Sequence, residues 1–220
     1  MFADELAERI GKCGVVAVLT VENAEDAVPL ARALLAGGVE AMELTLRTPA
    51  AVDGLRAVAA EVPEMLAGVG TVLTPEQVGE ICDAGAAFAV APGTNPSVLE
   101  AAQARGLSFA PGVATPSDIE RAVELGCRVL KFFPAEPIGG VRYLKSMAGP
   151  YAHLGLRFMP LGGLNAGNMS TYLREPLVLG VGGSWLAPKD RIAAHDWNTI
   201  TGTARQAIAL VRQVRARARR

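Results

Sequence analysis

Residues 66–85, LAGVGTVLTPEQVGEICDAG, contain one complete structural unit. The run of small and β-branched apolar residues at Leu66–Val69 is typical of a buried strand. Thr74 followed by Pro75 predicts the start of a helix, because a threonine side chain can cap free amides and proline fits the first helical position. Gly85 can then close the helix in a left-handed conformation. The stretch therefore predicts a strand followed by a helix.

The same pattern recurs along the chain at a spacing of about 20 to 25 residues, which is typical of βα units. The expected strands are Val15–Leu19, Ala41–Leu46, Leu66–Val69, Phe88–Ala91, Leu107–Ala110, Arg128–Phe133, Arg157–Pro160 and Leu177–Val181. The expected helices are Ala24–Ala36, Ala50–Val62, Pro75–Ala84, Ser97–Arg105, Pro116–Leu125, Val141–Ala148, Ala166–Leu173 and Thr199–Arg217. Further cap signals are Asn95, Thr115 and Asn165, and further closing glycines are Gly37, Gly106 and Gly126.

Strict alternation of strands and helices makes every connection a parallel crossover. Eight such units in a chain of 220 residues close most simply into a barrel. A doubly wound open sheet is the alternative, and the lack of a GxGxxG motif after the first strand disfavours it. Residues 1–12 place Asp4, Glu5 and Glu8 among apolar residues, which predicts a short amphipathic helix. We therefore predict an α/β fold in which residues 1–220 form one (β/α)8 barrel domain with a short N-terminal helix.

The composition disfavours several function classes. A formal net charge of −1 gives no chain-wide field that would attract nucleic acid or an anionic membrane. No apolar run approaches the roughly 18 residues of a membrane span. The cysteines are scattered without CxxC pairing, and no histidine or carboxylate cluster has metal-ligand spacing. We expect a cytoplasmic protein with no metal or other cofactor and no nucleic-acid or membrane partner. Five arginines lie near the C-terminus: Arg212, Arg215, Arg217, Arg219 and Arg220. They are interpreted as the solvated last turn of a helix, whose dipole they complement, rather than as a binding site for nucleic-acid phosphates.

Lys131 is the candidate nucleophile. Of the four lysines, it alone lies inside an apolar run, Val129–Phe133. Side-chain alternation sends Leu130 and Phe132 to the face opposite Lys131, which would project into the barrel lumen near its mouth. Apolar surroundings there would favour the neutral amine, which is the reactive form. The alternative is a structural lysine paired with a buried carboxylate.

The second predicted strand carries matching polar groups. Met42, Leu44 and Leu46 share one face, so Glu43, Thr45 and Arg47 share the lumen face. Glu43 would lie near the level of Lys131 and shuttle protons, while Arg47 would lie at the rim and clamp a substrate carboxylate. The alternative for this pair is a structural ion-pair network across the lumen.

Glycine-rich turns are expected after the last two strands, at residues 161–164 (LGGL) and 180–184 (GVGGS). Barrels commonly build a phosphate site from the loops after these strands, using backbone amides and a helix start. Ser184 could cap a short helix there and bind a phosphate oxygen.

Five stretches carry a family resemblance over nearly the whole chain: AGGV at residues 36–39, ELTLRT at 43–48, GVGTVL at 68–73, KFFPAE at 131–136 and GGSWL at 182–186. In this order they resemble the 2-keto-3-deoxy-6-phosphogluconate (KDPG) and 4-hydroxy-2-oxoglutarate (KHG) aldolases. The resemblance implies that Lys131 forms a carbinolamine and then an imine with a keto acid, that Glu43 moves protons through a bound water, and that Arg47 and Thr71 hold the carboxylate. The remaining implied binding residues are Pro92, Phe133, Leu161, Gly162, Gly163, Gly182, Gly183 and Ser184.

The resemblance further implies cleavage to pyruvate and a phosphorylated aldehyde in a homotrimer. Leu161 departs from the family, which usually carries threonine there, so we expect altered discrimination at the fourth carbon and consider the galactonate epimer as an alternative substrate. Two other functions stay open from the residues. One is a phosphosugar isomerase or epimerase that uses Glu43 as base and forms no imine, and the other is a ligand-binding barrel without turnover.

Overall fold

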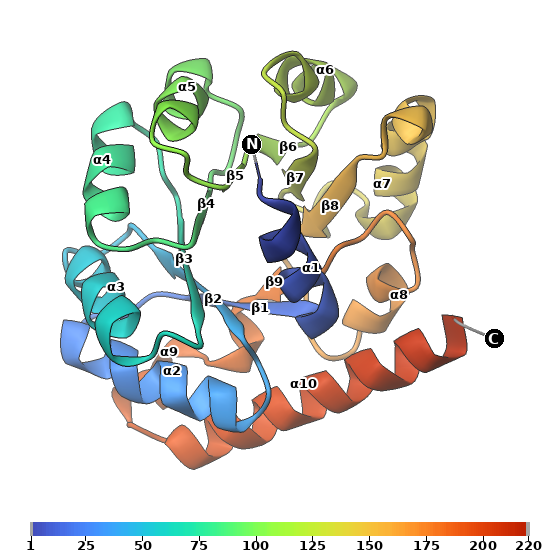
Figure 1. Cartoon of the computed structure of the whole chain (residues 1–220). Helices are drawn as coiled ribbons and strands as arrows, with labels where there is room; N and C mark the ends of the chain where they lie inside the picture. The colour runs from blue at the N-terminus through green and yellow to red at the C-terminus, as the bar shows by residue number, and fades with distance from the viewer. Residues whose placement is uncertain (1, 219–220) are drawn as a thin grey trace.

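The computed structural model describes residues 2–218, and its parallel strands close into a barrel surrounded by helices (Figure 1). The strands are β1 Val15–Leu19, β2 Ala41–Thr45, β3 Leu66–Gly70, β4 Phe88–Val90, β5 Phe109–Ala110, β6 Gly112–Val113, β7 Val129–Phe132, β8 Arg157–Pro160 and β9 Val181–Gly183. Their order is β5-β4-β3-β2-β1-β9 in one sheet and β6-β7-β8 in another. A single parallel bridge from Leu161, directly after β8, to Gly182 of β9 joins the second sheet to the first. A second parallel bridge pairs Phe158 of β8 with Val178, in the segment before β9.

The strands β5 and β6 occupy one position in the barrel and are separated by Pro111 alone. Proline has no amide hydrogen, so it interrupts the ladder. Its carbonyl still accepts a hydrogen bond from the Lys131 amide at 2.8 Å. The predicted (β/α)8 barrel is therefore confirmed, with its fifth strand in two pieces.

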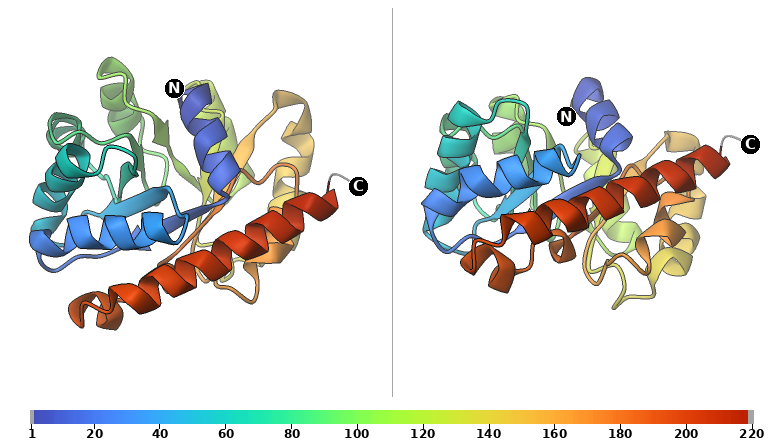
Figure 2. Two further views of the ribbon diagram at one scale, coloured as in Figure 1. Left: turned by 60° about the horizontal axis from the view of Figure 1, so that its bottom comes forward. Right: turned by 90° about the horizontal axis from the view of Figure 1, so that it is seen from below.

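The α-helices are α1 Asp4–Cys13, α2 Ala27–Ala36, α3 Ala50–Glu61, α4 Pro75–Asp83, α5 Pro96–Ala104, α6 Pro116–Glu124, α7 Gly140–Ala148, α8 Met169–Leu173, α9 Lys189–Ala193 and α10 Trp197–Ala218. The 3-10 helices are η1 Ala24–Asp26, η2 Gly149–Leu154 and η3 Ser184–Leu186. The long helix α10 crosses the outside of the barrel beside α2 (Figures 1 and 2), and the Thr201 hydroxyl donates to the Ala33 carbonyl at 2.9 Å. Arg219 and Arg220, part of the predicted basic helix turn, lie outside the described residues.

The last strand and the helices around it differ from the prediction. The strand expected at Leu177–Val181 begins only at Val181, and the preceding residues make a single bridge through Val178. These residues pair with β8 only at this bridge, where the Phe158 amide donates to the Leu177 carbonyl and the Leu179 amide donates to the Phe158 carbonyl, both at 2.8 Å. An apolar run predicts a buried segment but does not show how far its pairing extends. Helix α8 begins at Met169, three residues later than expected, and the short helix α9 was not predicted at all.

The predicted helix caps are confirmed at Thr74, Asn95 and Thr115, whose side chains accept hydrogen bonds from the first helical turn. Asn165 was predicted wrongly as a cap: it accepts from the Gly167 amide at 2.8 Å within the loop before α8. The predicted left-handed closing glycines are confirmed at Gly85, Gly106 and Gly126. Gly37 was predicted wrongly, because its φ is −87° and the left-handed residue is Gly38, with a φ of 89°.

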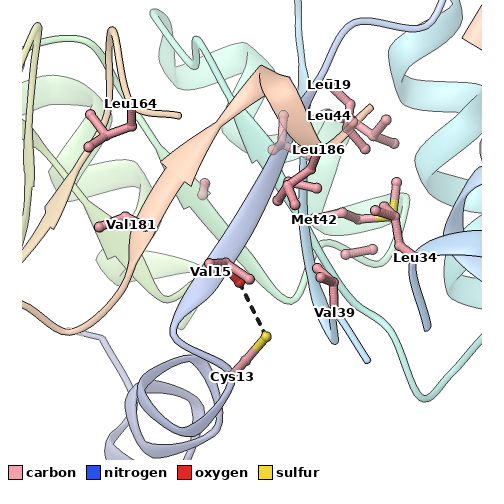
Figure 3. Packing of buried hydrophobic residues seen from close by; sticks show 14 of the residues in the cluster. Cys13, Val15, Leu19, Leu34, Val39, Met42, Leu44, Leu164, Val181 and Leu186 are labelled. Atoms are coloured by element: carbon pink, nitrogen blue, oxygen red, sulfur yellow. Dashed lines mark hydrogen bonds between the residues drawn. The ribbon is translucent and has the colours of Figure 1, made fainter. Parts of the chain in front are cut away.

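Apolar side chains form two separate cores. The larger core lies between the strands and the helices, where Leu19, Met42 and Leu44 pack with Leu34 (Figure 3). Leu130 and Phe132 belong to this outer core, as the predicted alternation requires. Cys13 lies at its edge, where the thiol donates to the Val15 carbonyl at 3.3 Å (Figure 3) and burial raises the thiol pKa.

The smaller core fills the inside of the barrel. Three apolar side chains near the N-terminus pack there, Phe2 before α1 and Leu6 and Ile10 within it. They pack with side chains from the starts of the strands, such as Phe88 and Val129. Figure 1 shows α1 lying across this end of the barrel. The predicted N-terminal helix is thus confirmed, and it closes the amino-terminal end of the barrel. Among residues 2–218 no helix has the length and apolar character needed to cross a membrane.

Candidate active site

Lys131 and Glu43 meet inside the barrel. The Lys131 ammonium nitrogen lies 3.2 Å from Glu43 Oε1, and the two side chains are only 7% and 2% exposed. Lys131 comes from β7 and Glu43 from β2, and both face the lumen because Leu130 and Phe132, like Met42 and Leu44, are turned toward the helices. The alternation of apolar and polar residues in both strands predicted this inward placement of both side chains.

The surroundings of Lys131 include both the carboxylate and the apolar group that the sequence places beside it. The amine contacts the Glu43 carboxylate and lies 5.3 Å from the centre of the Phe133 ring. Gly70 makes room for the carboxylate, because a Cβ atom at this position would come within 1.7 Å of Glu43 Oε1. Removing one partner of such a buried pair leaves an uncompensated charge, whereas an intact pair holds both groups in one geometry.

A cavity of about 670 Å³ opens beside the pair at the carboxyl-terminal ends of the strands. It lies over the ends of β1, β2, β7, β8 and β9. Its lining includes ten of the predicted site residues: Glu43, Arg47, Lys131, Phe133, Leu161, Gly162, Gly163, Gly182, Gly183 and Ser184. Within residues 2–218 no cluster of histidine, cysteine or carboxylate side chains has the arrangement of a metal site.

Thr71 and Pro92 are the two predicted site residues that do not line this cavity. They follow β3 and β4, on a different part of the rim. Thr71 has a left-handed backbone, with a φ of 65°, and Pro92 is exposed. Their roles in substrate binding stay predictions.

The glycine-rich turn after β8 is built as the sequence suggests. Gly162 and Gly163 have φ values of 97° and 83°, which favour glycine. The segment after Lys131 is fastened to this turn, because the Ala135 amide donates to the Leu161 carbonyl at 2.8 Å and the Glu136 amide donates to the Gly162 carbonyl at 3.0 Å. Two backbone hydrogen bonds therefore join the segment after β7 to the turn after β8.

A buried phenol strengthens the same connection. Tyr172, on α8, donates a hydrogen bond to the Glu136 carboxylate. Burial, followed by this hydrogen bond, raises the pKa of Tyr172. The phenol therefore stays protonated at neutral pH and can donate this hydrogen bond.

The second glycine-rich segment differs from the prediction. Gly182 and Gly183, expected in a turn, belong to β9. Ser184, expected as a helix cap, is instead the first residue of η3, which Gly183 precedes as its cap residue. The Ser184 side chain is exposed and lines the cavity, so its hydroxyl is available to a ligand.

Several cavity residues were not among the predicted site residues. The Thr45 hydroxyl donates to the Leu19 carbonyl at 3.0 Å, which uses its only proton. The Thr20 hydroxyl, 2.9 Å away, therefore donates to the Thr45 hydroxyl oxygen. The lone pairs of Thr20 are left for a ligand. Thr20 directly follows an apolar strand and Thr45 alternates with Glu43, so both carried a sequence signal. No periodicity marks Trp185 or Lys189.

A barrel with a buried lysine and carboxylate at its carboxyl-terminal mouth has the features of an enzyme active site, and such a lysine is the kind of amine that lyases use as a nucleophile. The family model for KDPG and KHG aldolase matches residues 6–203, and the chain belongs to this family. It is therefore an aldehyde-lyase, as the five sequence stretches predicted.

Named relatives agree with this assignment. The KHG/KDPG aldolase of Escherichia coli K12 is 46% identical over 194 residues, which are 88% of this chain and 90% of the relative. The structure of the KDPG aldolase of Zymomonas mobilis with 3-phosphoglycerate has a TM-score of 0.87 at 38% identity and covers 94% of this chain and 97% of its own. The structure of the Legionella pneumophila KDPG aldolase, with pyruvate captured as a covalent carbinolamine, has a TM-score of 0.86 at 38% identity. It covers 90% of this chain and 96% of its own.

Proposed function

We propose that this chain cleaves 2-keto-3-deoxy-6-phosphogluconate to pyruvate and glyceraldehyde 3-phosphate, with Lys131 as the nucleophile. The observation that carries the proposal is the buried contact between Lys131 and Glu43 at 3.2 Å, at the floor of a cavity open to small molecules. A carbinolamine formed with pyruvate in the Legionella relative supports the same chemistry here. The E. coli relative, a KHG/KDPG aldolase, supports a second activity on 4-hydroxy-2-oxoglutarate, which would give pyruvate and glyoxylate.

The reaction begins with a proton transfer that the Lys131–Glu43 contact provides. Glu43 accepts the proton that Lys131 must lose, and the neutral amine attacks the keto carbon of the substrate. The former carbonyl oxygen takes up two protons, one from the attacking nitrogen and one from Glu43, and leaves as water, which produces a protonated imine. Glu43 is close enough to serve each of these transfers directly or through one water.

Carbon–carbon cleavage follows from the imine. The hydroxyl on the fourth carbon gives its proton to Glu43 through a bound water, and the bond between the third and fourth carbons breaks. Its electron pair flows toward the positively charged imine, so the aldehyde departs and an enamine of pyruvate stays on Lys131. Protonation of the third carbon and hydrolysis of the imine then release pyruvate and restore the amine.

The two ends of the substrate need different binding groups. Arg47, exposed on the turn after β2, and Thr71 would hold the carboxylate. Backbone amides near Gly162 and Gly163, together with the Ser184 hydroxyl, would hold the phosphate, and Phe133 and Pro92 would shape the pocket. The 3-phosphoglycerate bound to the Zymomonas relative supports recognition of a phosphorylated ligand.

Leu161 should alter the choice between epimers at the fourth carbon. Its side chain is buried, lines the cavity and packs against Gly182. Leucine cannot donate or accept a hydrogen bond, so a substrate hydroxyl near it loses a partner that threonine would provide. We therefore expect weaker discrimination between the gluconate and galactonate epimers than a threonine would give.

The proposed reaction is tested by following pyruvate and aldehyde release from KDPG and from KHG in coupled assays. We expect equal amounts of both products from each substrate, and no turnover by Lys131→Met. Lys145→Met is the matched control, because Lys145 is exposed and does not line the cavity. Conversion of a phosphosugar to an isomer without pyruvate release would instead support the isomerase alternative. The homotrimer implied by the family is a separate proposal that analytical ultracentrifugation tests.

A further inference from the structure

A second lysine lines the active-site cavity. Lys189 is the first residue of α9, five positions after Ser184, and within the described part of the chain only Lys131 and Lys189 are lysines of the cavity lining. The Lys189 ammonium lies 3.0 Å from Glu22 Oε1, and both side chains are 65% exposed. Glu22, in the segment between β1 and η1, is not part of the lining.

The contact between Lys189 and Glu22 is easily exchanged. An ion pair between two exposed side chains contributes little to stability, because water screens the charges and both long side chains lose freedom. A phosphate offers a lysine a higher charge and several acceptor oxygens. The buried pair of Lys131 and Glu43, at a similar distance, has no such freedom.

The charges of the cavity leave a role for Lys189. The lining contains three cationic side chains, Arg47, Lys131 and Lys189, and one carboxylate, Glu43. In the proposed reaction Lys131 becomes the imine and Arg47 faces the substrate carboxylate. The phosphate would otherwise meet only neutral donors, namely backbone amides and the Ser184 hydroxyl, although Lys189 lines the same cavity as Ser184.

We propose that Lys189 is a specificity-determining residue that leaves Glu22 and pairs with the distal phosphate of the substrate. Glu22 then acts as a competing anion that holds the lysine at the cavity mouth while the site is empty. The proposal rests on the aldolase function proposed above and names the group that selects phosphorylated substrates over their unphosphorylated counterparts.

Substrate pairs test the proposal. We expect Lys189→Met to lower kcat/KM for KDPG by about 10- to 100-fold, the range for a lost hydrogen bond between charged groups, mainly through a higher KM. Cleavage of 2-keto-3-deoxygluconate, which has no phosphate, should stay the same within error. The matched control is Lys145→Met, since Lys145 also forms a 3.0 Å ion pair, with Glu175, and is 54% exposed but lies outside the cavity. An equal loss on both substrates would overturn the proposal.

The substitution Glu22→Gln should change kcat/KM for KDPG in the opposite direction to Lys189→Met. Removal of the competing carboxylate should raise kcat/KM for KDPG by about 2- to 5-fold, the range for an exposed ion pair, and should lower the inhibition constant of inorganic phosphate. A decrease in kcat/KM for both KDPG and 2-keto-3-deoxygluconate would contradict the proposed competition.

Two further measurements separate this proposal from the aldolase function. Calorimetric binding of inorganic phosphate needs no turnover, and Lys189→Met should weaken it whereas Lys145→Met should not. Trapping of pyruvate with borohydride should be retained in Lys189→Met. Trapping without any change in phosphate binding would overturn the role of Lys189 alone. No trapping in the unmodified protein would overturn the aldolase function, on which the role of Lys189 in substrate choice rests.

Discussion

The two ends of the barrel interior are built from opposite kinds of side chain. At the amino-terminal end Phe2, Leu6 and Ile10 close the lumen and pack against the apolar starts of the strands, such as Phe88 and Val129. At the carboxyl-terminal end the lumen opens into a cavity that holds buried charges. Burying charge costs free energy, whereas burying apolar surface stabilises the fold. The comparison therefore separates an end that contributes stability from an end that carries out the chemistry.

Replacement of the nucleophile gives the largest expected effect. Lys131→Met should lower kcat by at least about 10⁴-fold, because no imine can form. It should also destabilise the fold by about 3 to 5 kcal/mol if Glu43 stays charged, since that carboxylate loses its buried partner. Thermal melts and circular dichroism must accompany the assay, so that unfolding is distinguished from lost chemistry. Residual turnover above about one part in a hundred in a folded variant would remove Lys131 from the mechanism.

Replacement of the Glu43 carboxylate should give the second largest loss of kcat. Glu43→Gln keeps the shape of the side chain but not its ability to accept protons, and we expect kcat to fall by about 10²- to 10⁴-fold. Glu40→Gln serves as the control, because this exposed carboxylate lies just before β2 and does not line the cavity. Unchanged pyruvate release from Glu43→Gln would mean that another group moves the protons.

A substitution at the closed amino-terminal end of the barrel should lower the stability of the fold and leave catalysis unchanged. Ile10 is fully buried in the inner core, so Ile10→Ala should lower the free energy of unfolding by about 2 to 5 kcal/mol. Denaturant unfolding measures the loss, and kcat/KM for KDPG at a temperature where the variant is folded should match the unmodified protein. A comparable drop in kcat/KM would show that the two ends are not separable.

The smallest effect is expected at the wall of the open end. Leu161→Thr adds a hydroxyl to the cavity and should strengthen the preference between the gluconate and galactonate epimers by about 2- to 10-fold, the equivalent of one hydrogen bond. The ratio of kcat/KM values for the two epimers measures it. An unchanged ratio would exclude position 161 as the source of discrimination.

Alternation in the strands made the chemical end predictable. Lys131 and Glu43 interrupt apolar runs at period two, so their inward direction followed from their neighbours Leu130 and Met42. Other parts lacked such a signal. Gly182 and Gly183 have no side chain to show a period, so a strand was mistaken for a turn, and Lys189 lies in a helix of five residues, too short for periodicity. The contact between Lys189 and Glu22 joins positions at opposite ends of the chain, which only the closed barrel brings together.

The attachment point of pyruvate tests the nucleophile directly. The protein is incubated with pyruvate and sodium borohydride, digested and mapped by mass spectrometry. We predict a reduced pyruvate adduct on the peptide that contains Lys131 and on no peptide that contains only Lys12, Lys145 or Lys189. An adduct confined to another lysine, or no adduct while pyruvate is still released from KDPG, would contradict imine formation at Lys131.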